Sequence, residues 1–394
     1  MYDFVLFINS NTDGEVAKKV YKTAPVTRIT AYNAKDYHTF AKDLKSKLWI
    51  DPCFDGFPTK PVNEDDDKKN KWFDYFSDVE GFEYFLSTNL PKTAKIKELE
   101  PFVFSILDDC LSYKPDILTI PQLPHLATTT NNKINKILSK IYLKWSIERK
   151  FEGESILPVV FNNQNSTCSG AIRSSKLKTI QSLYNEAKAD GVWIVDSSLQ
   201  DQAGTGNFEK KRFPSLIDMH NKVKQTIKPK IHFAGPYWGI QLILWAREII
   251  SSPAFSIGSS YQYYISGGQP RTPSPRMAIP PLLRWARSSS DLKKWLRSSK
   301  SKIKIEVTKK QFEDLTKTYD HLYVSKKHKE QIAHFHHDWF KKYLNLPSAA
   351  RALALYQDLS SAYVLGSQLD DILSEKGSSR KPEVVAKQLM LNCL

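Results

Sequence analysis

Eight short apolar segments recur along the first 260 residues of this 394-residue chain. Most end in a polar residue, Gly or Pro, and most are followed by a stretch with helical periodicity. Continuous apolar runs that alternate with helices are typical of a parallel sheet covered on both faces. Eight such units are what an eight-fold β/α barrel of the TIM type requires. The segments are residues 3–8, 26–32, 48–51, 116–121, 156–161, 192–196, 230–234 and 255–258.

The sequence therefore predicts an α/β fold, a (β/α)8 TIM-like barrel, in residues 1–265. An insertion of about residues 52–114 separates the third and fourth strands, and residues 266–394 form a basic, mainly α-helical C-terminal region. A doubly wound open sheet is the competing architecture. It would carry a glycine-rich turn after the first strand, and residues 9–14 do not match that motif.

Charge is distributed unevenly. The whole chain has a net charge of +15, and residues 265–394 hold 23 Lys and Arg against 12 Asp and Glu. Residues 266–304 contain ten basic residues and one acid, Asp291. A concentrated positive patch attracts phosphate backbones, so nucleic acid is the expected partner. An acidic protein partner is the alternative.

The composition of the chain indicates its cellular location. No long apolar segment is present, so neither a transmembrane helix nor a membrane partner is expected, and the N-terminus is a first strand rather than a signal peptide. Cys53, Cys110, Cys168 and Cys393 form no CxxC pair, which fits a reducing, cytoplasmic location. The Lys- and Asn-rich composition suggests a prokaryotic source.

Two carboxylates are the candidate catalytic residues. Asp51 and Asp196 each end an apolar strand, and barrels place their chemistry at the carboxyl ends of the strands. Two carboxylates can share the roles of nucleophile and acid in glycosidic chemistry. The structural alternative is that Asp196 caps a turn and that Asp51 binds backbone amides.

Further strand-end residues are candidates for substrate binding, because amides can bind base edges and aromatic rings can stack on bases. These are Asp55, Gln122, Asn162, Gln164, Tyr237 and Tyr261. Each can equally serve loop structure or packing.

Phosphate and polynucleotide binding are assigned to the residues after strand eight, where many barrels hold phosphate. The predicted phosphate site is Gly267, Gly268, Arg271 and Arg276. A basic amphipathic helix over residues 282–296 is predicted to bind nucleic acid through Arg284, Arg287, Lys293, Lys294 and, just beyond it, Arg297. His334 and His337 are three residues apart on a predicted helix, but no zinc motif surrounds them, so no metal or cofactor is predicted.

These features favour a nucleic-acid-associated barrel enzyme of base exchange or N-glycosidic chemistry on tRNA or DNA. The layout of the barrel resembles that of tRNA-guanine transglycosylases, which exchange a base through an aspartate nucleophile. The Cys-x-Cys-x-x-Cys zinc cluster of that family is absent here, and membership is not inferred. A non-catalytic scaffold subunit and a small-molecule nucleoside or sugar-phosphate enzyme are the alternatives.

Overall fold

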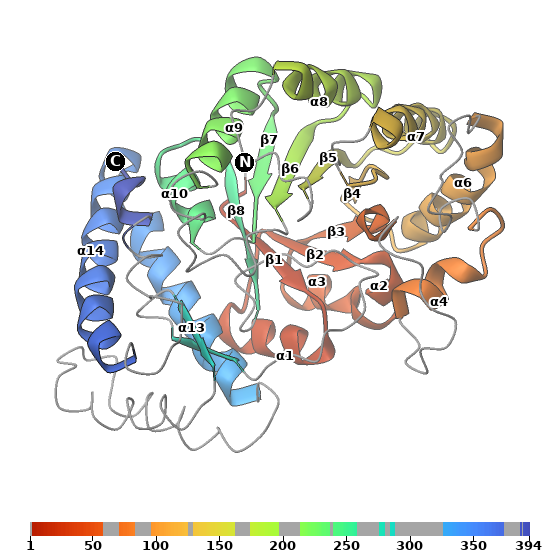
Figure 1. The fold of residues 1–394 in the computed structure, drawn as a ribbon. Helices are drawn as coiled ribbons and strands as arrows, with labels where there is room; N and C mark the ends of the chain where they lie inside the picture. Colours follow the sequence, from red (N-terminus) through yellow and green to blue (C-terminus); the bar gives the residue numbers. More distant parts are fainter. Residues whose placement is uncertain are drawn as a thin grey trace.

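A computed structural model describes residues 2–57, 71–82, 96–124, 129–161, 174–196, 213–236, 239–257, 276–279, 284–287, 326–373, 387 and 389–394. Within these residues, eight parallel strands form a closed barrel in chain order, with the last strand paired to the first (Figure 1). The strands are β1 (Val5–Ile8), β2 (Val26–Thr30), β3 (Lys47–Asp51), β4 (Ile117–Thr119), β5 (Glu154–Phe161), β6 (Gly191–Asp196), β7 (Ile231–Ala234) and β8 (Ser252–Ser256). The predicted barrel fold is confirmed, and the open sheet is excluded.

Helices surround the barrel because one side of each strand is apolar and has to be covered. Following the strands are α1 (Asn11–Val20), α2 (Ala31–Tyr37), α3 (Thr39–Asp43), α4 (Lys71–Ser77), α6 (Ile96–Ser112), α7 (Thr129–Glu148), α8 (Ser174–Glu186), α9 (Phe213–Thr226) and α10 (Ile240–Ala246). The sequence at the start of α1 stabilises the N-terminus of that helix. Ser10 accepts a hydrogen bond from the backbone N–H of Asp13, and the Asp13 carboxylate lies in the positive first turn.

Large aromatic rings fill the interior of the barrel. Trp49 stacks on Phe233 at 5.0 Å between ring centroids and meets Trp193 edge-on at 5.5 Å. Phe7 packs edge-on against both tryptophans. The two indoles also join neighbouring strands, since the Trp49 Nε1 donates to Thr119 Oγ1 and the Trp193 Nε1 donates to the carbonyl oxygen of Gly235, both at 2.8 Å. The interior is therefore a packed core rather than a pore.

The C-terminal region contains two long helices, α13 (Lys326–Leu344) and α14 (Ser348–Leu373), which agrees with its predicted helical character. Figure 1 shows them beside α1 and α10, and α13 contacts α1 while α14 contacts α10. The Phe340 ring of α13 lies 5.5 Å from that of Phe4 and 5.3 Å from that of Phe255. Helix α13 follows β8 along the chain and packs on rings next to the first strand and on the last strand, Phe4 and Phe255. It therefore occupies the place of the eighth helix of the barrel.

The prediction of a helix over residues 282–296 is wrong where the structure describes that segment. Residues Arg284–Arg287 form a strand, β10, that pairs antiparallel with β9 (Arg276–Ile279). Pro280 and Pro281 lie between the two strands, and adjacent prolines favour a turn of extended chain over helix. The apolar and basic residues of segment 282–296 have helical spacing, but residues 284–287 of that segment pair as a strand.

A membrane-spanning helix is not found among the helices that the structure describes, because none is both long and apolar enough.

Candidate active site at the carboxyl end of the barrel

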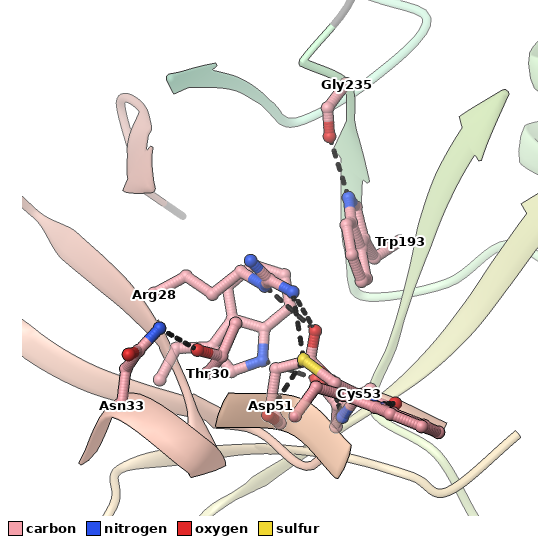
Figure 2. A network of polar contacts seen from close by, with 10 residues as sticks. Arg28, Thr30, Asn33, Asp51, Cys53, Trp193 and Gly235 are labelled. Atoms are coloured by element: carbon pink, nitrogen blue, oxygen red, sulfur yellow. Dashed lines mark hydrogen bonds and ion pairs between the residues drawn. The ribbon is translucent and has the colours of Figure 1, made fainter. Parts of the chain in front are cut away.

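A buried ion pair lies inside the barrel near the carboxyl ends of β2 and β3. The Arg28 Nε donates to Asp51 Oδ2 at 2.9 Å, and the Arg28 Nη2 contacts the same oxygen. The second oxygen, Asp51 Oδ1, accepts the backbone N–H of Cys53 at 2.9 Å. Both residues are almost inaccessible, with 1% of Arg28 and 2% of Asp51 exposed. Figure 2 shows the guanidinium directed at the carboxylate and at Cys53.

The position of the pair follows from strand register. Arg28 pairs with Phe7 on one side and Trp49 on the other, so it belongs to the same interior layer as these rings. Asp51 lies two residues beyond Trp49 on β3 and therefore points to the same interior side, one layer nearer the carboxyl end. Strand alternation thus brings the two charges together in the layer where barrels carry out chemistry.

Aromatic faces cover the cation. The Arg28 guanidinium lies 4.4 Å from the ring centroid of Phe7 and 4.9 Å from that of Trp193. Rings at these distances attract a cation through their quadrupole and also exclude water from it. The Arg28–Asp51 interaction is therefore strong and fixed in direction, in a medium of low dielectric.

The segment after β3 forms a tight turn against the pair. Cys53 has a left-handed backbone, with φ 59° and ψ 46°, and its Sγ lies 3.7 Å from the Arg28 Nη2. The Trp72 indole donates to the carbonyl oxygen of Cys53 at 3.0 Å and thereby anchors the insertion to this turn. A non-glycine residue is uncommon in this conformation, which is often found at functional sites.

Two other cysteines are unsuited to thiolate chemistry. Burial raises the pKa of the Cys110 thiol well above its ordinary value, helped by the nearby negative charges of Asp109 and Asp51. Burial also raises the pKa of Cys393 to about 12. Both side chains are thiols at neutral pH, so neither is a ready nucleophile.

The second predicted acid, Asp196, is the last residue of β6 and is 1% exposed. It lies beside Phe161 in the register with β5. Alternation along β6 assigns Asp196 to the side of Val192 and Ile194, opposite to the interior side of Trp193. The two oxygens of Asp51 bond to Arg28 and Cys53, and Asp196 holds a strand-end position of opposite parity to that of Asp51.

Two predicted substrate-binding residues are described. Asp55 is buried in the short 3-10 helix η1 (Phe54–Gly56) just after the strained turn. The side-chain amide of Gln122 donates to the backbone carbonyl of Asn135 and to Ser139 Oγ at 3.2 and 3.0 Å, which ties the segment after β4 to α7. Gln122 therefore contributes to the position of a loop at the barrel mouth.

The remaining predicted residues lie either on the paired strands β9 and β10 or outside the described residues. The hairpin register places Arg276 directly opposite Arg287, and places Arg284 on the same strand as Arg287. Like charges directly across a ladder repel each other, so an anion bound there would relieve the repulsion. The following predicted residues lie outside the described residues: Asn162, Gln164, Tyr237, Tyr261, Gly267, Gly268, Arg271, Lys293, Lys294 and Arg297.

Sequence reasoning missed Arg28, although a signal was present. The second apolar run reads Val-Thr-Arg-Ile-Thr, so a full charge stands in the middle of a strand that is otherwise suited to burial. A buried arginine requires a carboxylate partner, and Asp51 at the end of the neighbouring strand is the obvious one.

No protein-family model matches this sequence, and no curated protein matches it either. Among the residues that the structure describes, no group of three His, Cys, Asp or Glu side chains is placed to hold a metal ion.

Proposed function

We propose that the chain is a nucleic-acid-associated barrel enzyme that carries out base exchange or another N-glycosidic reaction on tRNA or DNA. The observation that carries the proposal is the buried Arg28–Asp51 pair at the carboxyl end of the barrel. Burying two charges is expensive, and apolar residues of similar volume commonly give equal or better stability. Retention of the pair at the position where barrels hold catalytic groups therefore supports a functional role.

Asp51 is the first candidate for the reacting acid. Glycosidic bond cleavage develops positive charge on the sugar ring, and a fixed carboxylate stabilises that charge or attacks it. Arg28 acts as a positioning residue, because it holds one carboxylate oxygen while the Cys53 amide holds the other. Asp196, at the carboxyl end of β6, is the second candidate acid.

The proposal of a polyanionic substrate is supported by the basic segment that follows β8. That connection holds ten basic residues and one acid in residues 266–304, and β9–β10 places Arg276 opposite Arg287. The segment leaves the barrel at the carboxyl end of β8, on the same side as Asp51. A phosphate backbone held there would present a nucleotide to the barrel mouth.

The test is mass spectrometry of tRNA, duplex DNA and free nucleosides after incubation with the full-length protein. We expect Asp51→Asn to reduce turnover about 100-fold or more. Turnover of Asp196→Asn is measured in the same way, as a separate variant. Asp116→Asn and Asp190→Asn are matched controls, because these carboxylates bond the backbone N–H groups of Leu48 and Ser155 at the opposite end of the barrel. Equal turnover of the Asp51 variant and the controls would overturn the assignment.

A non-catalytic scaffold is the second candidate, and one observation favours it. Both oxygens of Asp51 already accept hydrogen bonds from the protein, which is what a structural carboxylate does. If no member of the panel changes in mass while the protein binds tRNA or DNA, the scaffold function replaces the enzymatic one.

A further inference from the structure

Seven helix-to-strand turns of the barrel contain a non-glycine residue in the left-handed backbone conformation. In six of the seven that residue is lysine, with φ between 49° and 60°, and in the seventh it is Glu248. Each lysine comes two residues after the helix ends and shortly before the next strand begins. The six are Lys22, Lys45, Lys114, Lys150, Lys188 and Lys228.

These turns share one face of the molecule. All eight strands are parallel, so every helix-to-strand turn lies at the amino ends of the strands, opposite to the Arg28–Asp51 pair. All six lysine side chains are exposed, and within the described part of the chain none of them forms an ion pair. We call this set the lysine ring.

Backbone geometry alone does not select lysine at these positions. The left-handed conformation places Cβ too close to the next carbonyl oxygen, and helix ends of this kind favour Gly or Asn. A cation does interact favourably with the negative end of a helix. That benefit is equally available one or two residues earlier, in the last helical turn, where the backbone is unstrained.

The surrounding charge is also positive. The seven turns, residues 21–25, 44–47, 113–116, 149–154, 187–190, 227–230 and 247–251, contain ten Lys and Arg and five Asp and Glu. Two of the acids pair with lysines of the same turns that do not belong to the lysine ring, Glu154 with Lys47 and Asp190 with Lys230, which leaves the ring lysines as the source of the excess charge. The lysine ring therefore presents net positive charge to solvent.

We propose that the lysine ring binds the phosphate backbone of a double-helical nucleic acid without reading its sequence. Dispersed, exposed ammonium groups suit phosphate contacts, which give affinity and orientation but no sequence selectivity. Single strands are typically bound by aromatic side chains that stack on bases. Among side chains whose exposure the structure describes, no large aromatic is exposed, so a duplex is the better fit.

This surface is distinct from the barrel mouth, and the proposal does not depend on the reaction assigned there. The mouth is reached from the carboxyl ends of the strands, whereas the ring lies at their amino ends. A duplex on the ring would hold the protein on a long nucleic acid while the mouth remains open.

The test replaces all six ring lysines with glycine in the full-length chain. Glycine adopts the left-handed conformation freely, so the variant should melt at or above the temperature of the parent, and loss of binding cannot be ascribed to unfolding. The control removes the same charge elsewhere, with Gln at Lys97, Lys136, Lys140, Lys222, Lys341 and Lys342 on the outer helices. Binding of a fluorescent 30-base-pair duplex is followed by anisotropy between 50 and 300 mM salt.

We expect the glycine variant to bind the duplex at least about 100-fold more weakly at 100 mM salt. The slope of log K against log salt should fall by about 2 or more, because each phosphate contact contributes roughly 0.9 to it. The control variant should retain most of the duplex affinity and most of the salt slope. A parallel series with duplex RNA identifies which double helix is preferred.

Three results would overturn the proposal. The first is an equal loss of affinity in the ring and control variants, which would mean that only net charge matters. The second is tighter binding of a 30-nucleotide single strand than of the duplex. The third is ring-dependent binding of phosphatidylserine vesicles that exceeds binding of either duplex, which would assign the ring to an anionic lipid surface.

Discussion

Arg28 and Asp51 each lose hydration inside the barrel and are stabilised only by each other and by their immediate neighbours. The cation lies against two aromatic faces, and the anion accepts one backbone amide. In such a setting, removal of one partner is far worse than removal of both, because the remaining charge has no compensation.

A double-mutant cycle tests this at the Arg28–Asp51 pair. We expect Arg28→Met to lower the free energy of unfolding by about 3–5 kcal/mol, and Asp51→Leu to do the same. The double variant should recover most of that loss, as measured by urea unfolding. Additive losses in the cycle would show that the two residues do not act as a unit.

Buried histidines make the fold sensitive to acid. Burial lowers the pKa of His336 from 6.5 to about 4 and that of His232 to about 3, so both are neutral in the folded protein. The unfolded chain binds protons near pH 6.5. Each histidine therefore contributes stability that is complete above about pH 6.5 and is lost as the pH falls toward its folded-state pKa.

His336→Leu should reduce this dependence. Between pH 7 and pH 5 the wild-type protein should lose about 2 kcal/mol more unfolding free energy than the variant, since pH 5 is 1.5 units below the unfolded-state pKa. The exposed His334 of the same helix provides the control substitution, His334→Leu. Identical pH profiles for His336→Leu and the wild type would contradict the prediction.

At the scale of elements, α13 is fixed to the barrel by an aromatic cluster and by charge. Phe340 packs against Trp245 at 4.8 Å as well as against Phe4 and Phe255. Lys329 of α13 pairs with Asp13 of α1, and Glu330 pairs with Lys19, both at 2.7 Å. The Lys19–Glu330 pair lies at the surface and is worth little, so the aromatic cluster and the largely buried Lys329–Asp13 pair supply most of the attachment.

Phe340→Ala should therefore lower the free energy of unfolding by about 3–5 kcal/mol in chemical denaturation. Leu353→Ala on α14 is the matched control, because that side chain is 54% exposed and should change stability by less than about 0.5 kcal/mol. A similar effect of the two substitutions would show that α13 does not depend on the cluster.

For the whole molecule, the contacts of α13 and α14 with the barrel predict that the barrel and the C-terminal helices fold as one unit. The wall between β8 and β1 is covered by α13, a helix that begins almost 70 residues after β8 ends. Without it, Phe4, Trp245 and Phe255 would lose their cover, and an exposed aromatic patch of this kind promotes association.

A chain that ends at residue 325 should thus fail to unfold cooperatively in calorimetry and should elute as aggregates in size-exclusion chromatography. Co-expression with residues 326–394 should restore a monodisperse complex with a cooperative transition. A truncated chain that is monodisperse and unfolds cooperatively by itself would show that the C-terminal helices are a separate unit.

Much of the fold could be predicted from periodicity. The eight apolar runs contain or overlap all eight barrel strands, and the region predicted to be mainly helical contains α13 and α14. Periodicity failed at residues 284–287, where a short basic stretch has helical spacing but pairs as a strand with residues 276–279. The candidate site was predicted in part: Asp51 was identified, but its partner Arg28 was not.

The order of polar and apolar residues by itself determined that this chain forms a parallel sheet covered by helices, because strands buried on both faces need such a cover. Closure of that sheet into a barrel was decided by the tertiary structure. Only the tertiary structure decided which charges meet. Arg28 reaches Asp51 because register places them in successive interior layers of adjacent strands, whereas Asp196 holds a strand-end position of opposite parity on β6. The lysine ring likewise exists only in three dimensions, since barrel closure gathers onto one face six turns that are far apart in the chain.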